Sequence, residues 1–269
     1  MSASLFERLF SLEGKAALVT GASGGIGRVL AIAFAEVGAV VGLHGVSLEK
    51  LETTRQFIER AGGKGIILPA ELRDTAACQK VISDVRHGLG RLDVLVNCAG
   101  VNRRKPIRAV TEDDFDFITD INLRSVFFLS QAAHPIMRKQ GGGKIINIGS
   151  VTSTEGLGGI SVYGATKAAV AQLTKSMALE WAKDNIQVNC LAPGFMFTPL
   201  TEVGLWGDAH RKQWLLDRIP MQRPGQPEEL IGTALLLASN ASSYMTGQTI
   251  NVDGGYLAGG SWLREEEEN

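Results

Sequence analysis

Seven short apolar runs alternate with longer segments of helical periodicity, and this alternation constrains the fold more than any other feature of the sequence. The apolar runs lie at 16–20, 39–44, 65–70, 92–97, 144–149, 186–192 and 248–253. Apolar residues recur at helical spacing within 25–37, 47–61, 74–89, 112–139, 161–184, 207–218 and 227–238. Several of the short runs are apolar at nearly every position, as expected for strands that helices cover on both faces.

Repeated strand–helix–strand units predict an α/β fold, a doubly wound parallel sheet of about seven strands with helices on both faces. The expected strand order is 3-2-1-4-5-6 with one further edge strand. The chain is interpreted as one domain over residues 1–269, with its core at about 12–257. The segment 195–226 has no clear period and is predicted to be a mobile substrate loop over a site. The acidic segment 264–269 is expected to be a solvated tail.

Charge and cysteine content exclude several classes of protein. A formal net charge of −1 gives no electrostatic basis for binding nucleic acid or an anionic membrane, and no apolar run reaches membrane-spanning length. The three cysteines, Cys78, Cys98 and Cys190, are widely spaced in apolar contexts. They argue against a disulfide framework and for a reducing compartment, so we expect a cytoplasmic protein. No His, Cys or Asp cluster has ligand spacing, so no metal is expected.

A glycine-rich turn, Thr20-Gly21-Ala22-Ser23-Gly24-Gly25-Ile26-Gly27, joins the first predicted strand to the first predicted helix. Gly21 permits a tight turn, Gly25 lets the backbone approach a pyrophosphate, and Gly27 lets the helix pack on the strand. The helix N-terminus directs N–H groups at the negative charge. Because strand, turn and helix follow in order, the motif predicts a dinucleotide-binding Rossmann sheet rather than a merely tight turn. Gly21, Ser23, Gly25, Ile26 and Gly27 are its expected cofactor-binding residues.

Tyr163 and Lys167 lie four residues apart within a predicted helix, and Ser150 follows the fifth strand shortly before them. Residues at this spacing share a helix face, so the ammonium of Lys167 can lie beside the phenol of Tyr163. A free phenol has a pKa of about 10, and a nearby positive charge lowers it. Such a tyrosine could exchange a proton with an alcohol or carbonyl oxygen. The same spacing also occurs on solvated faces of amphipathic helices.

Taken together, these motifs resemble the short-chain dehydrogenase/reductase family. The sequences TGASGGIG, NCAG (97–100), Asn122 in INLRS, Ser150, Tyr163 with Lys167, and PGFMFT (193–198) occur in the family's order. The resemblance implies a nicotinamide cofactor and hydride transfer between NAD(P) and a secondary alcohol or ketone. It implies acid/base chemistry for Tyr163, a ribose contact for Lys167, a substrate-oxygen contact for Ser150, and a water in a proton path for Asn122.

The resemblance also implies further cofactor contacts near the ends of the strands. They are Glu71 and Leu72 near the adenine, Asn97, Ala99 and Gly100 after the fourth strand, Tyr163 and Lys167, and Pro193, Gly194 and Thr198 after the sixth. Cys98 replaces the second Asn of the family's NNAG motif.

The choice between NADP and NAD depends on the segment Leu43-His44-Gly45-Val46-Ser47. It lacks the carboxylate that usually accepts hydrogen bonds from the adenosine ribose of NAD. Val46 stands where many NADP-using relatives carry Arg, so His44, Ser47 or Lys50 would have to reach a 2′-phosphate. The missing carboxylate favours NADP over NAD, and His44 is the candidate contact.

The substrate evidence comes from Asn102-Arg103-Arg104-Lys105, which follows the fourth strand at the edge where ligands bind in open sheets. Arg103 and Arg104 could hold a carboxylate bidentately, with Thr152 and Phe195 as further contacts, or these cations could be a solvated rim. Several segments resemble family members that act on sugar acids or polyols. GLHG (42–45) resembles 3-oxoacyl-(acyl-carrier-protein) reductases, the alternative function. A catalytically silent nucleotide-binding relative is a third, which the intact Ser–Tyr–Lys set argues against.

The segments 112–139 and 161–184 carry more apolar residues than one buried face needs, for example Val126, Phe127, Phe128 and Leu129. Surplus apolar surface suggests an interface. In the family these two helices form a dimer and the last strand completes a tetramer, so the resemblance implies a homotetramer that acts on a small-molecule substrate.

Overall fold

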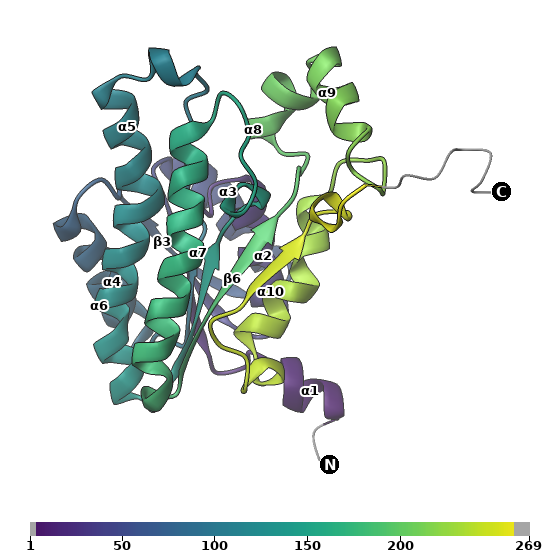
Figure 1. The fold of residues 1–269 in the computed structure, drawn as a ribbon. Helices are drawn as coiled ribbons and strands as arrows, with labels where there is room; N and C mark the ends of the chain where they lie inside the picture. Colours follow the sequence, from purple (N-terminus) through teal and green to yellow (C-terminus); the bar gives the residue numbers. More distant parts are fainter. Residues whose placement is uncertain (1–3, 261–269) are drawn as a thin grey trace.

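The computed structural model describes residues 4–260, and these form helices around one seven-stranded parallel sheet (Figure 1). The strands are β1 (Ala16–Val19), β2 (Val40–Gly45), β3 (Lys64–Pro69), β4 (Val94–Asn97), β5 (Gly143–Ile148), β6 (Ile186–Pro193) and β7 (Thr249–Val252). Their order is β3-β2-β1-β4-β5-β6-β7, which confirms the predicted order with β7 at the edge. The order reverses between β1 and β4, and in open α/β sheets ligands bind at such a point, outside the carboxyl ends of the strands. The acidic segment 264–269 lies outside the described residues.

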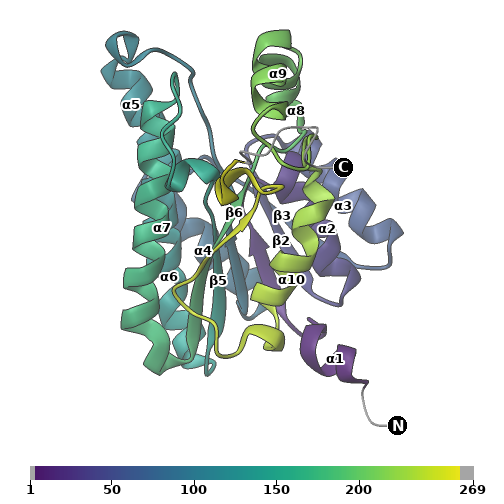
Figure 2. The same ribbon diagram turned by 45° about the vertical axis from the view of Figure 1, so that its right-hand side comes forward.

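Helices cover both faces of the sheet, as the sequence predicted (Figure 2). One layer contains α2 (Gly25–Glu36), α3 (Leu48–Arg60) and α10 (Ile231–Ala238), and the other contains α4 (Thr75–Leu89), α6 (Ser125–Lys139) and α7 (Ser161–Trp181). Outside these layers lie α1 (Leu5–Phe10) and short 3-10 turns at Ile107–Ala109, Val151–Ser153, Ala182–Asp184, Pro227–Leu230, Asn240–Ser242 and Tyr256–Ala258. None of the described helices is long and apolar enough to cross a membrane.

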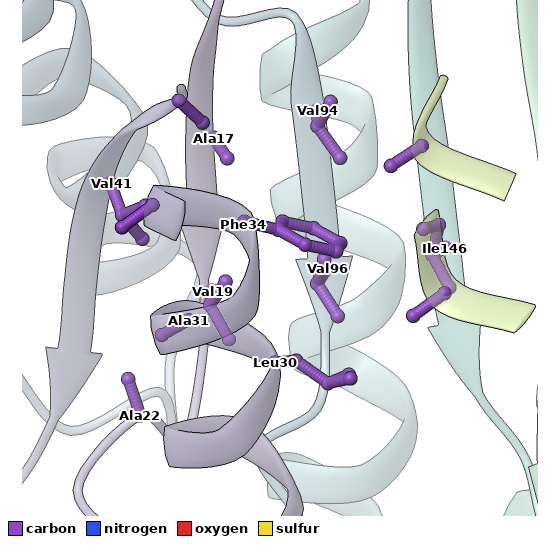
Figure 3. Packing of buried hydrophobic residues seen from close by; sticks show 14 of the residues in the cluster. Ala17, Val19, Ala22, Leu30, Ala31, Phe34, Val41, Val94, Val96 and Ile146 are labelled. Carbon is purple, nitrogen blue, oxygen red and sulfur yellow. The ribbon is translucent and has the colours of Figure 1, made fainter. Parts of the chain in front are cut away.

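Helix α2 is held against the sheet by apolar side chains that reach β1 and β4. Figure 3 shows Phe34 lying over β4 beside Val94 and Val96, with Leu30 one helical turn away. Both Phe34 and Leu30 are fully buried, and burial of side chains of this size stabilises a fold by about 1.5–3 kcal/mol each. This packing fixes the N-terminus of α2, and with it the glycine-rich turn, at the carboxyl edge of the sheet.

The predicted long helix at 112–139 is interrupted. It consists of α5 (Glu112–Thr119), a π-helical turn η2 (Asp120–Arg124) and α6. Helix α5 begins at Thr111, whose side chain exchanges hydrogen bonds with Asp114 in a capping box. The π turn was not predicted, because an inserted residue leaves the apolar pattern on either side intact. Such turns occur often at functional sites, and this one contains Asn122.

The segment after β6 rises above the carboxyl edge of the sheet as α8 (Pro199–Thr201), a π-helical turn η5 (Glu202–Trp206) and α9 (Ala209–Leu216) (Figure 1). We refer to residues 199–216 as the lid. Leu205, Trp206 and Leu215 are buried in a small cluster with Val151 and Tyr256. The lid therefore packs on the residue that follows Ser150. The mobility expected for 195–226 stays a prediction.

Candidate active site

The glycine-rich turn packs so closely on its surroundings that it leaves little room for side chains. Gly21 has a φ of +72°, and a Cβ added there would lie 3.0 Å from the Cα of Ala99. A Cβ on Gly27 would lie 2.3 Å from the carbonyl oxygen of Gly21. Ile26 lies in the first turn of α2, and the carbonyl of Ser23 accepts from Arg28 Nη2 at 2.7 Å. The sequence interpretation of a tight turn under a closely packed helix agrees with this geometry.

Thr20, which sequence reasoning did not single out, ties the glycine-rich turn to the turn after β4. Its Oγ1 accepts from the N–H groups of Cys98 and Ala99 at 2.9 and 3.0 Å and donates to the carbonyl of Val96 at 3.2 Å. The sequence signal for this role was a hydroxyl residue placed between a buried strand and the first glycine. These bonds hold two of the expected cofactor segments beside each other.

Asn97 is committed to a buried polar network beneath the site. Its Nδ2 donates to Ser130 Oγ at 3.0 Å and to Asn147 Oδ1 at 2.8 Å, and Asn147 in turn donates to Thr174 Oγ1 at 2.9 Å. All four residues are buried, and the network links β4 and β5 to α6 and α7. The two amide donors of Asn97 are thus used, while its buried Oδ1 has no hydrogen-bond partner among residues 4–260.

Ser150 stands at the carboxyl end of β5, as expected, and its hydroxyl is positioned by Thr152. The Oγ accepts from the backbone N–H of Thr152 at 3.1 Å and lies 3.0 Å from Thr152 Oγ1. The next residue, Ser153, donates from its Oγ to the carbonyl of Lys167 at 3.0 Å. This bond attaches the Ser150 turn to α7. Because the backbone donor occupies a lone pair of Oγ, the Ser150 proton can still be donated to another oxygen.

Lys167 is buried with its charge unneutralised by protein carboxylates. Its side chain is 5% exposed, its Nζ donates to the carbonyl of Ile148 at 2.7 Å, and no carboxylate of residues 4–260 is paired with it. The Nζ lies 5.6 Å from the centroid of the Tyr163 ring, so the pair shares one face of α7 as the spacing predicted. An ammonium has three donors, and burying it with one acceptor is costly. Two donors of the ammonium therefore have no hydrogen-bond acceptor among residues 4–260, and the predicted ribose contact of Lys167 stays a prediction.

Asn122 fastens the turn after β4 to the helices beside it. Its Oδ1 accepts from the N–H of Val101 at 2.8 Å, and its Nδ2 donates to the carbonyl of the same residue at 2.9 Å. A longer contact of 3.4 Å reaches Thr166 Oγ1, which itself donates to the carbonyl of Tyr163. The π turn presents this fully buried amide to Val101. The expected role of Asn122 in holding a water stays a prediction.

Gly100 and Thr198 border the space between the glycine-rich turn and Lys167. A Cβ on Gly100 would lie 3.9 Å from Lys167 Nζ, and a Cβ on Gly25 would lie 3.8 Å from the Cβ of Thr198. Thr198 thus faces the expected pyrophosphate loop. On the same side of the site, Pro193 ends β6, and Gly194 N donates to the carbonyl of Val252 at 2.9 Å.

His44 does not have the environment that a phosphate-binding cation requires. It is 2% exposed, its Nε2 lies 3.1 Å from the carbonyl of Ala70, and burial lowers its pKa to about 4. A neutral buried imidazole offers no positive charge to a 2′-phosphate, which argues against the role suggested from the sequence. Ser47 caps α3. Glu71 is exposed after β3, while Leu72 is buried beside it.

The adjacent residues Arg103 and Arg104 have different partners, which corrects the expectation that both face the substrate. Arg103 pairs with Asp113 and with Asp114, the latter at 3.1 Å, and its guanidinium lies 4.2 Å from the Phe117 ring centroid. Lys105 also pairs with Asp114. In an extended segment alternate side chains point to opposite sides, so Arg103 and Lys105 turn to α5 and their charge is neutralised there.

Arg104 turns to the other side, toward the lid. Its Nη1 donates to the carbonyl of Gly204 at 2.6 Å, and no carboxylate of residues 4–260 is paired with it. Burial lowers the pKa of Arg104, the charge of Arg211 lowers it further, and Tyr163 acts in the opposite direction. Arg104 is therefore a cation within electrostatic range of the Tyr163 phenol. Phe195, another expected substrate contact, packs edge-on against Tyr256 at 4.9 Å between ring centroids.

Across residues 4–260, no group of three or more His, Cys, Asp or Glu side chains has a metal-binding arrangement. Lys167 and Arg104 supply positive charge near Tyr163. The arrangement combines a hydroxyl donor, a phenol beside an ammonium, and a glycine-lined approach at the reversal point of the sheet.

Comparison with known proteins connects this arrangement to NADP-binding enzymes. A family model described as Enoyl-(Acyl carrier protein) reductase matches residues 21–257. Gluconate 5-dehydrogenase of Gluconobacter oxydans is 42% identical over 247 residues, covering 92% of this chain and 96% of that protein. A 3-oxoacyl-(acyl-carrier-protein) reductase of Thermotoga maritima is 41% identical over 246 residues, covering 91% and 99%. A gluconate 5-dehydrogenase from Burkholderia cenocepacia, solved in complex with NADP and tartrate, is 39% identical with a TM-score of 0.91, covering 96% and 100%.

Proposed function

The chain belongs to the short-chain dehydrogenase/reductase family of oxidoreductases that act on CH–OH groups, and we propose that its reaction is hydride transfer between NADP and a sugar acid. The observation that carries the substrate class is Arg104. Its guanidinium is within electrostatic range of Tyr163 and bonds only a neutral carbonyl of the described residues. A guanidinium of this kind binds a carboxylate bidentately, so a hydroxylated carboxylate is the favoured substrate.

The proposed chemistry is R–CHOH–R′ + NADP⁺ ⇌ R–CO–R′ + NADPH + H⁺. The nicotinamide, when bound, would accept the hydride from the alcohol or donate it to the ketone. In the oxidative direction Tyr163 takes the proton from the substrate hydroxyl, and in the reductive direction it returns it. Lys167 favours negative charge on the phenol oxygen and donates to the cofactor ribose. Ser150 donates a hydrogen bond to the substrate oxygen as charge develops there.

The proposal of NADP rather than NAD rests on the absence of an acidic residue after β2 and on the Burkholderia relative, whose crystals contain NADP. We assign the pyrophosphate to the glycine-rich turn at the N-terminus of α2, where backbone N–H groups favour a negative charge. Equilibrium binding of NADPH and NADH, measured by fluorescence, tests this directly. Tighter binding of NADH would overturn the assignment of NADP while leaving the reaction class intact.

The substrate proposal is tested by the KM of matched acidic and neutral polyols, D-gluconate and D-glucitol, in Arg104→Ala and Arg103→Ala variants. Loss of a charge-assisted hydrogen bond costs about 1.5–3 kcal/mol. We therefore expect Arg104→Ala to raise the KM for the acid about 10- to 100-fold. Arg103→Ala is the matched control, because its charge is already paired with Asp113 and Asp114. Equal effects of the two substitutions would exclude a carboxylate contact by Arg104.

Reduction of a 3-oxoacyl group carried by an acidic carrier protein is the second candidate. The Thermotoga relative and the description of the family model support it. Activity on acetoacetyl thioesters without activity on any sugar acid or polyol would favour this reaction. Nucleotide binding without turnover of either class would favour the catalytically silent relative.

We further propose a homotetramer in the cytoplasm. An exposed groove of about 600 Å³ runs between η2–α6 and α7, and Phe127 in it is 40% exposed. Its lining is Thr119, Asp120, Leu123, Arg124, Phe127, Phe128, Ala169, Gln172, Leu173 and Ser176. Exposed apolar side chains in such a groove suit an interface between copies. Light scattering of the purified protein gives the mass, and a monomer would contradict this part. The three free cysteines support a reducing compartment.

A further inference from the structure

Two guanidinium groups meet at one backbone carbonyl above the site. The carbonyl oxygen of Gly204 accepts from Arg104 Nη1 at 2.6 Å and from Arg211 Nη1 at 2.7 Å. Arg104 belongs to the turn after β4, Gly204 to the π turn of the lid, and Arg211 to α9. The turn after β4 and the lid therefore each contribute one cation to the same point.

The protein balances only part of the charge at this point, because Arg211 has a carboxylate partner and Arg104 has none among residues 4–260. A carbonyl oxygen has two lone pairs, and both are used by donors that carry a full positive charge. The nearest carboxylate of the described residues is Asp208, whose Oδ2 lies 3.8 Å from Arg211 Nη1 and whose Oδ1 accepts the backbone N–H of Arg211 at 2.9 Å. Asp208 is thus used mainly as the N-cap of α9. Two like charges held together in this way leave a position that favours an anion.

The packing of the lid relates this position to the chemistry. Leu205 and Trp206, which follow Gly204, are buried against Val151, the neighbour of Ser150. Trp206 Nε1 also donates to the carbonyl of Met196 at 3.1 Å, at the base of the lid. Arg104 is within electrostatic range of Tyr163. An anion held by both arginines would consequently lie where the lid packs beside the Ser150 turn, and it would attach α9 to the turn after β4.

We propose that Arg104 and Arg211 form one carboxylate-binding subsite, and that the substrate carboxylate bridging them holds the lid closed over Tyr163. This inference rests on the proposed function and adds Arg211 as a residue that determines specificity. A planar carboxylate presents two oxygens to two guanidinium groups, so it satisfies donors that now share one carbonyl. A neutral polyol of the same length lacks this bridge.

The test compares Arg211→Gln with Lys212→Gln in the full-length, NADP-loaded protein. Lys212 is exposed, adjacent on the same helix, and makes no side-chain hydrogen bond or ion pair within residues 4–260, so its substitution removes the same charge elsewhere. Calorimetry measures the Kd of D-gluconate and of D-glucitol. Hydrogen–deuterium exchange of residues 199–216 reports lid closure, and turnover is measured in parallel. Melting temperatures establish that each variant is folded.

We expect gluconate, but not glucitol, to slow exchange in the lid of the unchanged protein. Arg211→Gln should weaken gluconate binding about 10- to 100-fold and abolish that slowing, whereas Lys212→Gln should change binding less than about twofold. Arg211→Lys, which keeps the charge, should restore part of the affinity. If Arg211→Gln does not fold, the Kd of gluconate in Arg211→Lys is the deciding measurement, because lysine keeps the charge but cannot bind a carboxylate bidentately. A Kd equal to that of the unchanged protein would then contradict the subsite.

The outcomes separate this inference from the proposed function. Turnover of gluconate with equal effects of the Arg211 and Lys212 substitutions would overturn the two-arginine subsite and leave the function standing. Binding of gluconate that depends on Arg211, without turnover, would support the subsite and overturn hydride transfer to a sugar acid. Absence of gluconate binding in the unchanged protein would overturn both.

Discussion

Replacing Asn122 by Ala should destabilise the fold and the site together. The amide is fully buried, its Oδ1 accepts from Val101 N at 2.8 Å, and its Nδ2 donates to Val101 O at 2.9 Å. The substitution leaves both backbone groups of the half-buried Val101 without these partners, and each unsatisfied group costs about 1–3 kcal/mol where it is shielded from water. We expect the free energy of unfolding to fall by about 2–6 kcal/mol, and the melting temperature by at least about 4 °C.

The catalytic consequence follows from the neighbour of Val101. A Cβ on Gly100 would lie 3.9 Å from Lys167 Nζ, so loosening this turn displaces backbone beside the ammonium. We expect kcat to fall at least about tenfold, because small misplacements in a site are costly. Thermal unfolding and steady-state kinetics measure both effects, with exposed Asn251→Ala as the control. An unchanged melting temperature would refute the structural reasoning, and an accompanying loss of kcat would instead support a water-holding role.

Three further substitutions test other parts of the site. Tyr163→Phe should lower kcat by about 10²–10⁴ while the Kd for NADPH changes less than about twofold, and retention of most of the turnover would exclude Tyr163 as acid/base. Gly27→Ala should lower the melting temperature and weaken nucleotide binding, because its Cβ would lie 2.3 Å from Gly21 O. The control Gly232→Ala lies in open space on α10 and should instead stabilise the fold by about 0.5–1 kcal/mol. Equal melting temperatures of the Gly27 and Gly232 variants would contradict the predicted clash at Gly27. Burial lowers the pKa of His44 from 6.5 to about 4, so on acidification the unfolded chain binds the proton before the folded protein does. The stability that comes from neutral His44 is therefore present above pH 6.5 and is lost as the pH falls toward 4. His44→Gln should flatten this part of the stability curve, and parallel curves for variant and unchanged protein would show that His44 does not titrate there.

Patterns of apolar residues predicted the sheet well because its inner strands, such as β1 and β4, are covered on both faces. The run 16–20 is apolar at every position except Thr20, and the order of the strands in the sheet follows from the right-handed crossovers between them. The π turn at 120–124 could not be found this way. It depends on the buried amide of Asn122 reaching Val101, a contact between segments that no periodicity records.

The candidate site was predictable where a motif combines spacing with a strand end. Ser150, Tyr163 and Lys167 meet this condition, and the structure brings the turn of Ser150 against α7 through Ser153. Their catalytic roles stay predictions. The environment of His44 argues against the predicted phosphate contact, because a polar residue at the end of a strand can equally point into the protein, where burial keeps it neutral.

The substrate side was predicted only in part, since it depends on tertiary contacts. Arg103 and Arg104 are indistinguishable in the sequence, yet one is neutralised by α5 and the other reaches Gly204. Arg211 carried no signal at all. Its partner is a backbone carbonyl whose position is set by the π turn of the lid.

The alternation of side chains along 103–105 has a consequence for how such a protein could change its preferred substrate. Lys105 faces α5 and Arg104 faces the lid, because neighbouring side chains point to opposite sides. Deletion of one residue before Arg104 would therefore move each of these side chains to the other side. Lys105, which now pairs with Asp114 of α5, would then take the place of Arg104 on the side of the lid. The catalytic side chains would stay in place. A change in the length of this short stretch would therefore alter substrate selectivity without replacing any of its residues.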